Sequence, residues 1–264
     1  MILAGVLVGM LVGLTGIGGG SLLAPGLVAF FGMRPLAAVG TALIAKAAMK
    51  WIALTPQIQA REINYKVGGF LVAGAAPSAV ATVVALIVLA HIGLDLDRWV
   101  RWVLGGVALL AGAATVLRPL YSYRFHDSDM RVLASLKVRL TAVIIVGLVT
   151  GFLLALTAIG GSALTIPVLG LLYLMPTKRV AGTDAFVTAI VAAAAALFQA
   201  VGGNIAWAVA GNLTLGALPG LLVGSWLSRR RLLPEVVYRT VLGVFVAAMG
   251  GWMLYSLFRS SSPF

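Results

Sequence analysis

Apolar residues fill most of the chain in long stretches that are separated by short polar segments. About 20 consecutive apolar residues span the hydrocarbon core of a bilayer, so each stretch is long enough for one transmembrane helix or for two shorter ones. The pattern therefore predicts an all-α polytopic membrane protein without a separate soluble domain. The stretches lie near residues 1–32, 36–55, 67–92, 99–117, 138–175, 180–201, 205–227 and 236–258.

The composition supports the same class. Of the 264 residues, 61% are hydrophobic and 10% are charged, whereas about a quarter of the residues in a soluble domain are charged. The first apolar stretch begins directly after Met1 and has no basic segment before it. We therefore interpret it as a first span rather than as a cleaved signal peptide.

The net charge of +12 comes from Lys and Arg residues in the short segments between the spans. Such residues set the orientation of a membrane protein, so we do not expect nucleic-acid binding. The chain has no cysteine, which excludes disulfides and thiolate metal sites. Neither His91 nor His126 has a neighbouring set of metal ligands, so we expect no metal and no cofactor.

One segment of the chain returns later in altered form. LTGIGGGSLLAPG at 14–26 matches LTAIGGSALTIPV at 156–168, an offset of 142 residues. The same offset aligns VGTAL at 39–43 with AGTDA at 181–185. The sequence therefore predicts a tandem duplication. Its parts are a first transmembrane half at 1–120, a linker at 121–137 and a second transmembrane half at 138–264.

The charges in the loops predict how the two halves are oriented. If the polar linker is cytoplasmic, most of the other basic loops lie on its side of the membrane as well. Arg61 and Lys66 then lie inside, whereas the equivalent loop around Gly203 and Asn204 is uncharged and lies outside. This predicts an inverted-topology repeat in the plasma (inner) membrane, an architecture typical of secondary transporters.

Glycines interrupt the first apolar stretch of each half. Runs such as Gly18, Gly19 and Gly20 disfavour a continuous helix, and the arm that follows, roughly 21–32, is too short for a comfortable span. We therefore expect a broken or re-entrant helix pair in each half. The half-helix after the break would present free N–H groups and its positive dipole end to a small anion. An alternative is that the glycines only allow close helix packing. The predicted substrate-binding residues at the breaks are Gly18, Gly19, Gly20 and Ser21 in the first half and Gly160, Gly161 and Ser162 in the second.

The same motifs carry a family resemblance. GIGGGSLLAPGL and VGTAL in the first half, with AIGGSALTIPVL and AGTDA in the second, resemble the TauE/SafE family of sulfite exporters over nearly the whole chain. The resemblance implies an anion transporter whose substrate is sulfite or an organosulfonate such as sulfoacetate.

Three ionisable residues lie inside predicted spans. Lys46 follows Pro35 by 11 residues, which places it roughly 16 Å deep in a hydrocarbon core of about 30 Å. A charge at that depth indicates a function, either anion binding or an ion pair. Lys50 lies one turn further on the same face and either joins the site or reaches the cytoplasmic interface. For Asp184, three roles stay open, namely an ion pair with Lys46, a coupling proton and a local structural role.

Thr41 and Thr183 occupy equivalent positions in the two halves, each next to a glycine. Their hydroxyl groups either hydrogen-bond an oxyanion or bond back to their own helix. Together these features predict a secondary transporter that binds a small anion near the membrane midplane between the halves, with protons as a possible coupling ion. An anion channel or facilitator is the alternative. A membrane-embedded enzyme is less favoured because the chain lacks a catalytic cluster.

Overall fold

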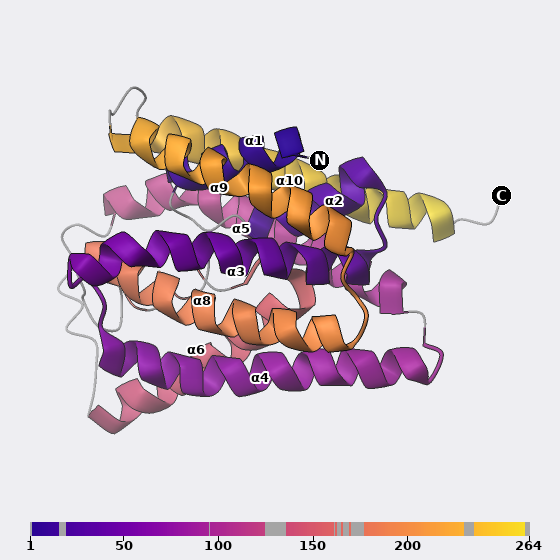
Figure 1. The fold of residues 1–264 in the computed structure, drawn as a ribbon, viewed down its shortest axis with the longest axis horizontal. Coiled ribbons are helices and arrows are strands. Elements are labelled where there is room, and N and C mark those ends of the chain that lie inside the picture. The colour runs from indigo at the N-terminus through magenta and orange to yellow at the C-terminus, as the bar shows by residue number, and fades with distance from the viewer. Residues whose placement is uncertain are drawn as a thin grey trace.

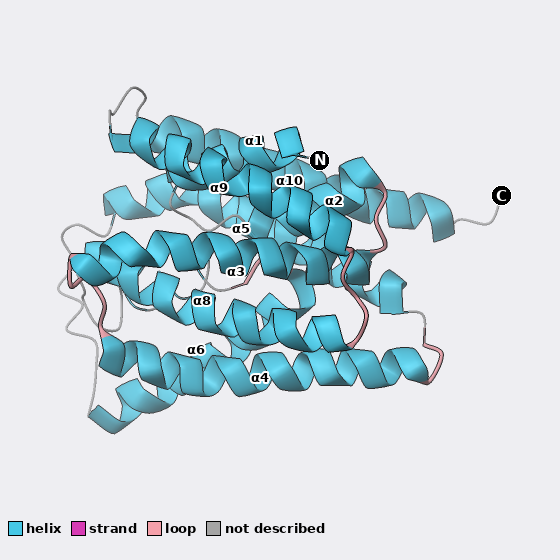
Figure 2. Ribbon diagram, in the orientation of Figure 1, coloured by secondary structure: helices cyan, strands magenta, loops and turns pink. Residues whose placement is uncertain are grey.

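A computed structural model describes residues 2–15, 20–94, 96–124, 136–160, 162, 165, 169, 177–229 and 235–261. These residues form helices joined by short turns, and no strand occurs among them (Figure 2). The all-α prediction is therefore confirmed. The helices are α1 (Ile2–Thr15), α2 (Gly20–Phe31), α3 (Pro35–Gln59), α4 (Tyr65–His91), α5 (Leu96–Arg124), α6 (Leu136–Thr157), α8 (Thr177–Val201), α9 (Trp207–Arg229) and α10 (Glu235–Ser261).

Six of the described helices are long and apolar enough to cross a membrane. Their apolar segments are Pro35–Gln59, Tyr65–His91, Leu96–Val116, Lys178–Val201, Trp207–Leu227 and Thr240–Arg259. Shorter apolar helices cover Ile2–Leu14, Leu22–Phe31 and Thr141–Thr157. The prediction of a multi-pass membrane protein is thus confirmed, and the first stretch is divided into two short helices as expected.

The long helices run roughly along one direction (Figure 1). The helices α3 and α8 lie side by side in the middle and run in opposite directions, with α4 and α6 on one side of them and α1 and α9 on the other (Figure 1). The apolar windows of α3 and α8 are 67% and 56% buried, more than those of the other four candidate spans. These two helices therefore form the core of the molecule.

Equivalent helices of the two halves make equivalent contacts. The helix α1 packs along α9, and α6, which corresponds to α1 at the offset of 142, packs along α4, which corresponds to α9. A Cβ atom added to Gly5 would lie 2.6 Å from the carbonyl oxygen of Leu213. A Cβ added to the equivalent Gly147 would lie 2.7 Å from the carbonyl oxygen of Leu71. Each half thus packs its first helix against the other half in the same way.

Glycine spacing explains how closely these helices approach. Gly5, Gly9 and Gly13 follow one another at intervals of four on α1 and face a similar row on α9. A side chain at any of them would collide with the backbone of α9. Small residues at this spacing let two membrane helices pack backbone to backbone. The facing row consists of Gly216, Gly220 and Gly224.

The chain leaves the first helix of the second half within the described residues. α6 ends at Thr157. After α6 the chain leaves the helix at Ala158, whose φ of +54° lies in the left-handed region. A residue other than glycine rarely adopts this conformation. The break predicted in this half therefore begins at Ala158.

Candidate functional site

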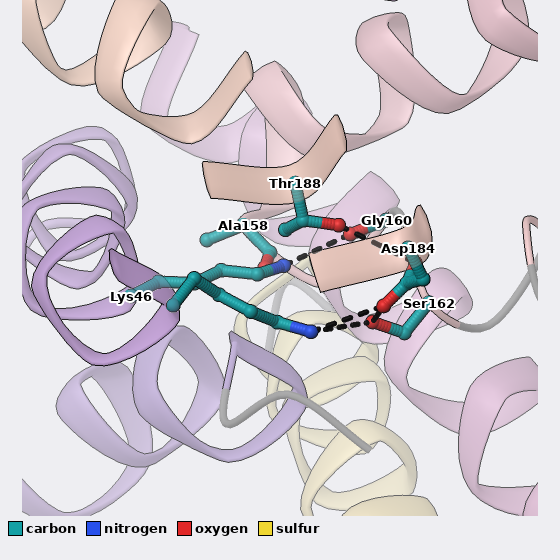
Figure 3. A network of polar contacts seen from close by, with 7 residues as sticks. Lys46, Ala158, Gly160, Ser162, Asp184 and Thr188 are labelled. Carbon is teal, nitrogen blue, oxygen red and sulfur yellow. Dashed lines mark hydrogen bonds and ion pairs between the residues drawn. The ribbon is translucent and has the colours of Figure 1, made fainter. Parts of the chain in front are cut away.

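A cluster of buried polar side chains lies between α3, α8 and the residues that follow α6 (Figure 3). Lys46 and Lys50 of α3 are 1% and 6% exposed, and Asp184 of α8 is 1% exposed. Ser162 and Thr188 complete the cluster, and both are buried. Burying charged groups is costly unless they are paired or hydrogen-bonded, so the partners of each charge determine what the cluster can do.

Lys46 is held by backbone carbonyl groups. Its Nζ donates hydrogen bonds of 2.7 Å to the carbonyl oxygen of Ala158 and 2.9 Å to that of Gly160 (Figure 3). These carbonyls lie where the chain leaves α6, at the negative end of that helix. A cation at this end of a helix is favoured by the helix dipole. Lys46 therefore fastens the middle of α3 to the break after α6.

Lys50 carries the ion pair of the cluster. Its Nζ lies 3.0 Å from Oδ2 of Asp184 and also donates to Oγ of Ser162 at 3.2 Å. Two hydroxyl groups support the carboxylate, because Ser162 donates to Oδ2 at 2.6 Å and Thr188 to Oδ1 at 3.4 Å. An ion pair of Asp184 with Lys46 is not what the structure shows.

The interpretation of Lys50 as a residue that reaches the cytoplasmic interface is wrong. Its side chain is 7% exposed and turns inward to α8. The physical reason is that the carboxylate of Asp184 and the hydroxyl group of Ser162 supply partners for a buried ammonium group. The sequence could not select between the two lysines, since Lys46 and Lys50 lie one turn apart on the same face of α3.

A cavity of about 350 Å³ reaches both lysines. Its lining extends along α3 from the buried Lys46 to the exposed Pro56 and half-buried Gln57. It therefore opens towards the end of the molecule where α3 ends and α4 begins. The other lining residues are Val12, Gly13, Met49, Ile52, Ala53, Ala181, Ala185, Leu221, Leu222 and Ser225.

The hydroxyl groups of Thr41 and Thr183 form equivalent hydrogen bonds between the two halves. Thr41 Oγ1 accepts a hydrogen bond of 3.2 Å from the backbone N–H of Ala206. Thr183 Oγ1 accepts one of 3.0 Å from the N–H of Asn64 and donates one of 2.8 Å to the carbonyl oxygen of Arg179. Thr183 thus bonds back to its own helix, which is one of its two expected roles. Neither threonine lines the cavity.

The structure describes only some of the residues at the two glycine breaks. Gly18, Gly19 and Gly161 lie outside the described residues, as does the side chain of Ser21. Gly20 is the first residue of α2. Gly160 joins the cluster through its carbonyl oxygen, and Ser162 joins it through its hydroxyl group. At the second break, the described contacts are therefore those of carbonyl groups with Lys46. The N–H groups that we expected to bind an anion are not among the described contacts.

Within the part of the chain that the structure describes, the cluster occurs once, although corresponding helices of the two predicted halves pack alike. At the offset of 142, Lys46 corresponds to Thr188 and Lys50 to Ala192, so the other half has no lysine at these positions. Among the described residues, the site is therefore built asymmetrically on an approximately symmetric framework.

Comparisons with known proteins agree with this architecture. The family model for the sulfite exporter TauE/SafE matches residues 1–255. The probable membrane transporter protein YjnA of Bacillus subtilis is 31% identical over 230 residues, which cover 87% of this chain and 90% of YjnA. The probable membrane transporter protein YunE of the same organism is 22% identical and covers 97% of this chain and 96% of YunE. No solved structure matches the chain. The chain therefore belongs to the TauE/SafE family, and it is a multi-pass membrane transporter and not an enzyme.

Proposed function

We propose that this protein is a secondary carrier for a small anion, sulfite or an organosulfonate such as sulfoacetate, which binds at the cavity beside Lys46 and Lys50. The observation that carries the proposal is the pair of buried ammonium groups at the inner end of a cavity that opens at one end of the molecule. Positive charge at this depth attracts an anion into a region where water screens it poorly. The name of the matching family supports sulfite or a related anion.

A carrier is favoured over a channel by the packing on the opposite side. Val12 and Leu221 of the cavity lining are each 7% exposed, and Gln57 is half-buried. At the offset of 142 they correspond to residues that are 1%, 0% and 0% exposed, respectively. These equivalent positions are packed more tightly than the cavity lining, which supports a carrier in one end state. The equivalent residues are Leu154, Ala79 and Gln199.

The two halves are proposed to have inverted topology. Supporting this, α3 and α8 correspond at the offset of 142 and run in opposite directions (Figure 1). Arg61, Lys66 and Lys178 lie at the end of the molecule where the cavity opens. We assign this end and the linker at 121–137 to the cytoplasm, because basic residues prefer that side, and we place the protein in the plasma membrane. If the two halves exchanged their conformations, this cavity would close and an equivalent cavity would open at the other end of the molecule.

The glycine breaks and Asp184 complete the proposed site. Backbone N–H groups of Gly18, Gly19, Gly20, Ser21 and Gly161 are proposed to face the anion, since the sequence predicts a half-helix after each break. We propose that Asp184, which pairs with Lys50, carries a coupling proton, because carboxylates inside membrane spans are typical of proton relays.

Thermal stabilisation of the purified protein in detergent tests the proposal. Sulfite, sulfoacetate, thiosulfate, sulfate and acetate would be added separately at equal ionic strength. A ligand that binds only the folded state raises the melting temperature, and at equal concentration a tighter ligand raises it more. We expect stabilisation by sulfite or sulfoacetate and none by acetate. An equal response to every salt, or no response to any, would contradict the proposal.

A further inference from the structure

The two lysines differ in whether their partners can be exchanged. Lys46 donates to two backbone carbonyls, which cannot turn away without moving the chain itself. Lys50 donates to the carboxylate of Asp184 and the hydroxyl of Ser162, which are side-chain groups that can rotate. A substrate can therefore compete for Lys50 with much less rearrangement than for Lys46.

The carboxylate of Asp184 already occupies the position of an oxyanion. One of its oxygens accepts from both Lys50 Nζ, at 3.0 Å, and Ser162 Oγ, at 2.6 Å. An ammonium and a hydroxyl converging on one oxygen are the donors that a sulfonate or sulfite oxygen requires. If Lys50 is given up, the carboxylate retains hydroxyl donors, because Thr188 also bonds it.

We propose that Asp184 is a built-in competitor which the substrate displaces from Lys50, and that the site is thereby matched to a singly charged oxyanion. This inference rests on the proposed function. In it, Lys50 exchanges Asp184 for the substrate, whereas Lys46 keeps its hydrogen bonds to the backbone carbonyl groups. With both ammonium groups protonated, the described charges of the cluster, Lys46, Lys50 and Asp184, together leave one positive charge. A substrate with one negative charge balances them.

A doubly charged anion would leave one negative charge unbalanced inside the protein. Uncompensated charge in a region of low dielectric is costly. Such an anion, including sulfoacetate and fully ionised sulfite, therefore binds well only when a proton neutralises Asp184. The charge of the substrate and the need for a proton are in this way linked through a single side chain.

Two probes of similar size and different charge test the inference. Methanesulfonate carries one negative charge and sulfate carries two. Binding of each would be measured by calorimetry on purified protein at neutral pH, for the wild type and for Asp184→Asn. The asparagine still offers an oxygen to Lys50 but removes the negative charge. We expect the wild type to prefer methanesulfonate, and the substitution to raise the affinity for sulfate relative to methanesulfonate about tenfold or more.

Thr188→Val is the matched control, because it alters a hydrogen bond to the same carboxylate without changing the charge. We expect it to leave the ratio of the two affinities unchanged. Lys50→Met combined with Asp184→Asn removes both members of the ion pair, so it should remain folded and lose most of the affinity for both probes. Retained binding in this double variant would overturn the role of Lys50.

The outcomes separate this inference from the proposed function. If the wild type binds methanesulfonate but Asp184→Asn leaves the ratio of affinities unchanged, the charge-matching inference is wrong and the proposed anion binding stands. If the wild type prefers sulfate, the inference is likewise wrong. If the wild type binds neither probe nor any anion of the stabilisation panel, the proposed function and the inference both fail.

Discussion

Lys50 of α3 forms an ion pair of 3.0 Å with Asp184 of α8, and this contact joins the two predicted halves of the chain inside the region that spans the membrane. Its neighbour Lys46, one turn away, bonds only to carbonyl groups among the described contacts. The two lysines therefore have different roles, and substitutions at Lys46 and at Lys50 should affect stability and binding differently.

Lys46→Met should chiefly destabilise the fold. The methionine keeps the apolar length of the side chain, but it leaves the carbonyl groups of Ala158 and Gly160 buried without this donor. Each unsatisfied carbonyl costs about 1–3 kcal/mol. Thermal unfolding of the purified variant should show a lower melting temperature than the wild type. A wild-type melting temperature would contradict the assignment of Lys46 as the residue that holds the break after α6.

Lys50→Met should leave Asp184 as an unpaired buried carboxylate. Removing one partner of a buried ion pair typically costs about 3–5 kcal/mol. Adding Asp184→Asn should restore most of that stability, because no unpaired carboxylate then remains in the cluster. A double-mutant cycle on unfolding free energies measures the coupling. Additive effects of the two substitutions would mean that the pair is not formed in the membrane-embedded protein.

Gly9→Ala should weaken the packing of α1 on α9. A Cβ atom at this position would overlap the backbone of Ala217, and forcing atoms into a packed contact typically costs about 1–3 kcal/mol. Gly69→Ala on α4 is the matched control, since a Cβ there meets no atom within 4 Å. The yield of folded protein and its melting temperature should fall for the first variant only. Equal behaviour of the two would show that the glycine row is not a packing contact.

Inverted topology makes a direct prediction about Gln59 and Val201. They are the last residues of α3 and α8, they correspond at the offset of 142, and both are exposed. Because the chain has no cysteine, one can be introduced at either position without a background signal. An impermeant maleimide should label Gln59→Cys only from the cytoplasmic side and Val201→Cys only from the outside. Labelling of both from the same side would be incompatible with inverted halves.

Much of this architecture could be predicted from sequence because it depends on local patterns. Apolar stretches predicted the spans, and the first stretch forms two short helices, α1 and α2, as its length and glycines indicated. The burial of Lys46 followed from its position in the middle of an apolar stretch.

Contacts between distant segments could not be obtained in the same way. Asp184 lies 134 residues from Lys50, and only the packing of α3 on α8 determines which lysine it meets. The carbonyl groups that hold Lys46 carry no sequence signal, since every residue has one. The glycine row from Gly5 to Gly13 did carry a signal, namely small residues at intervals of four, which indicates close helix packing.

Transport by the purified protein in lipid vesicles tests the central claim, which is carriage of a small anion through the Lys50 site. Vesicles loaded with unlabelled sulfite or sulfoacetate would be diluted into a trace of the same labelled anion. We predict transient accumulation of the label by counterflow and a rate that saturates with substrate, both abolished in the Lys50→Met, Asp184→Asn double variant and kept in Gly69→Ala. A flux that rises without saturation and shows no counterflow, or one that the double variant retains, would contradict the account.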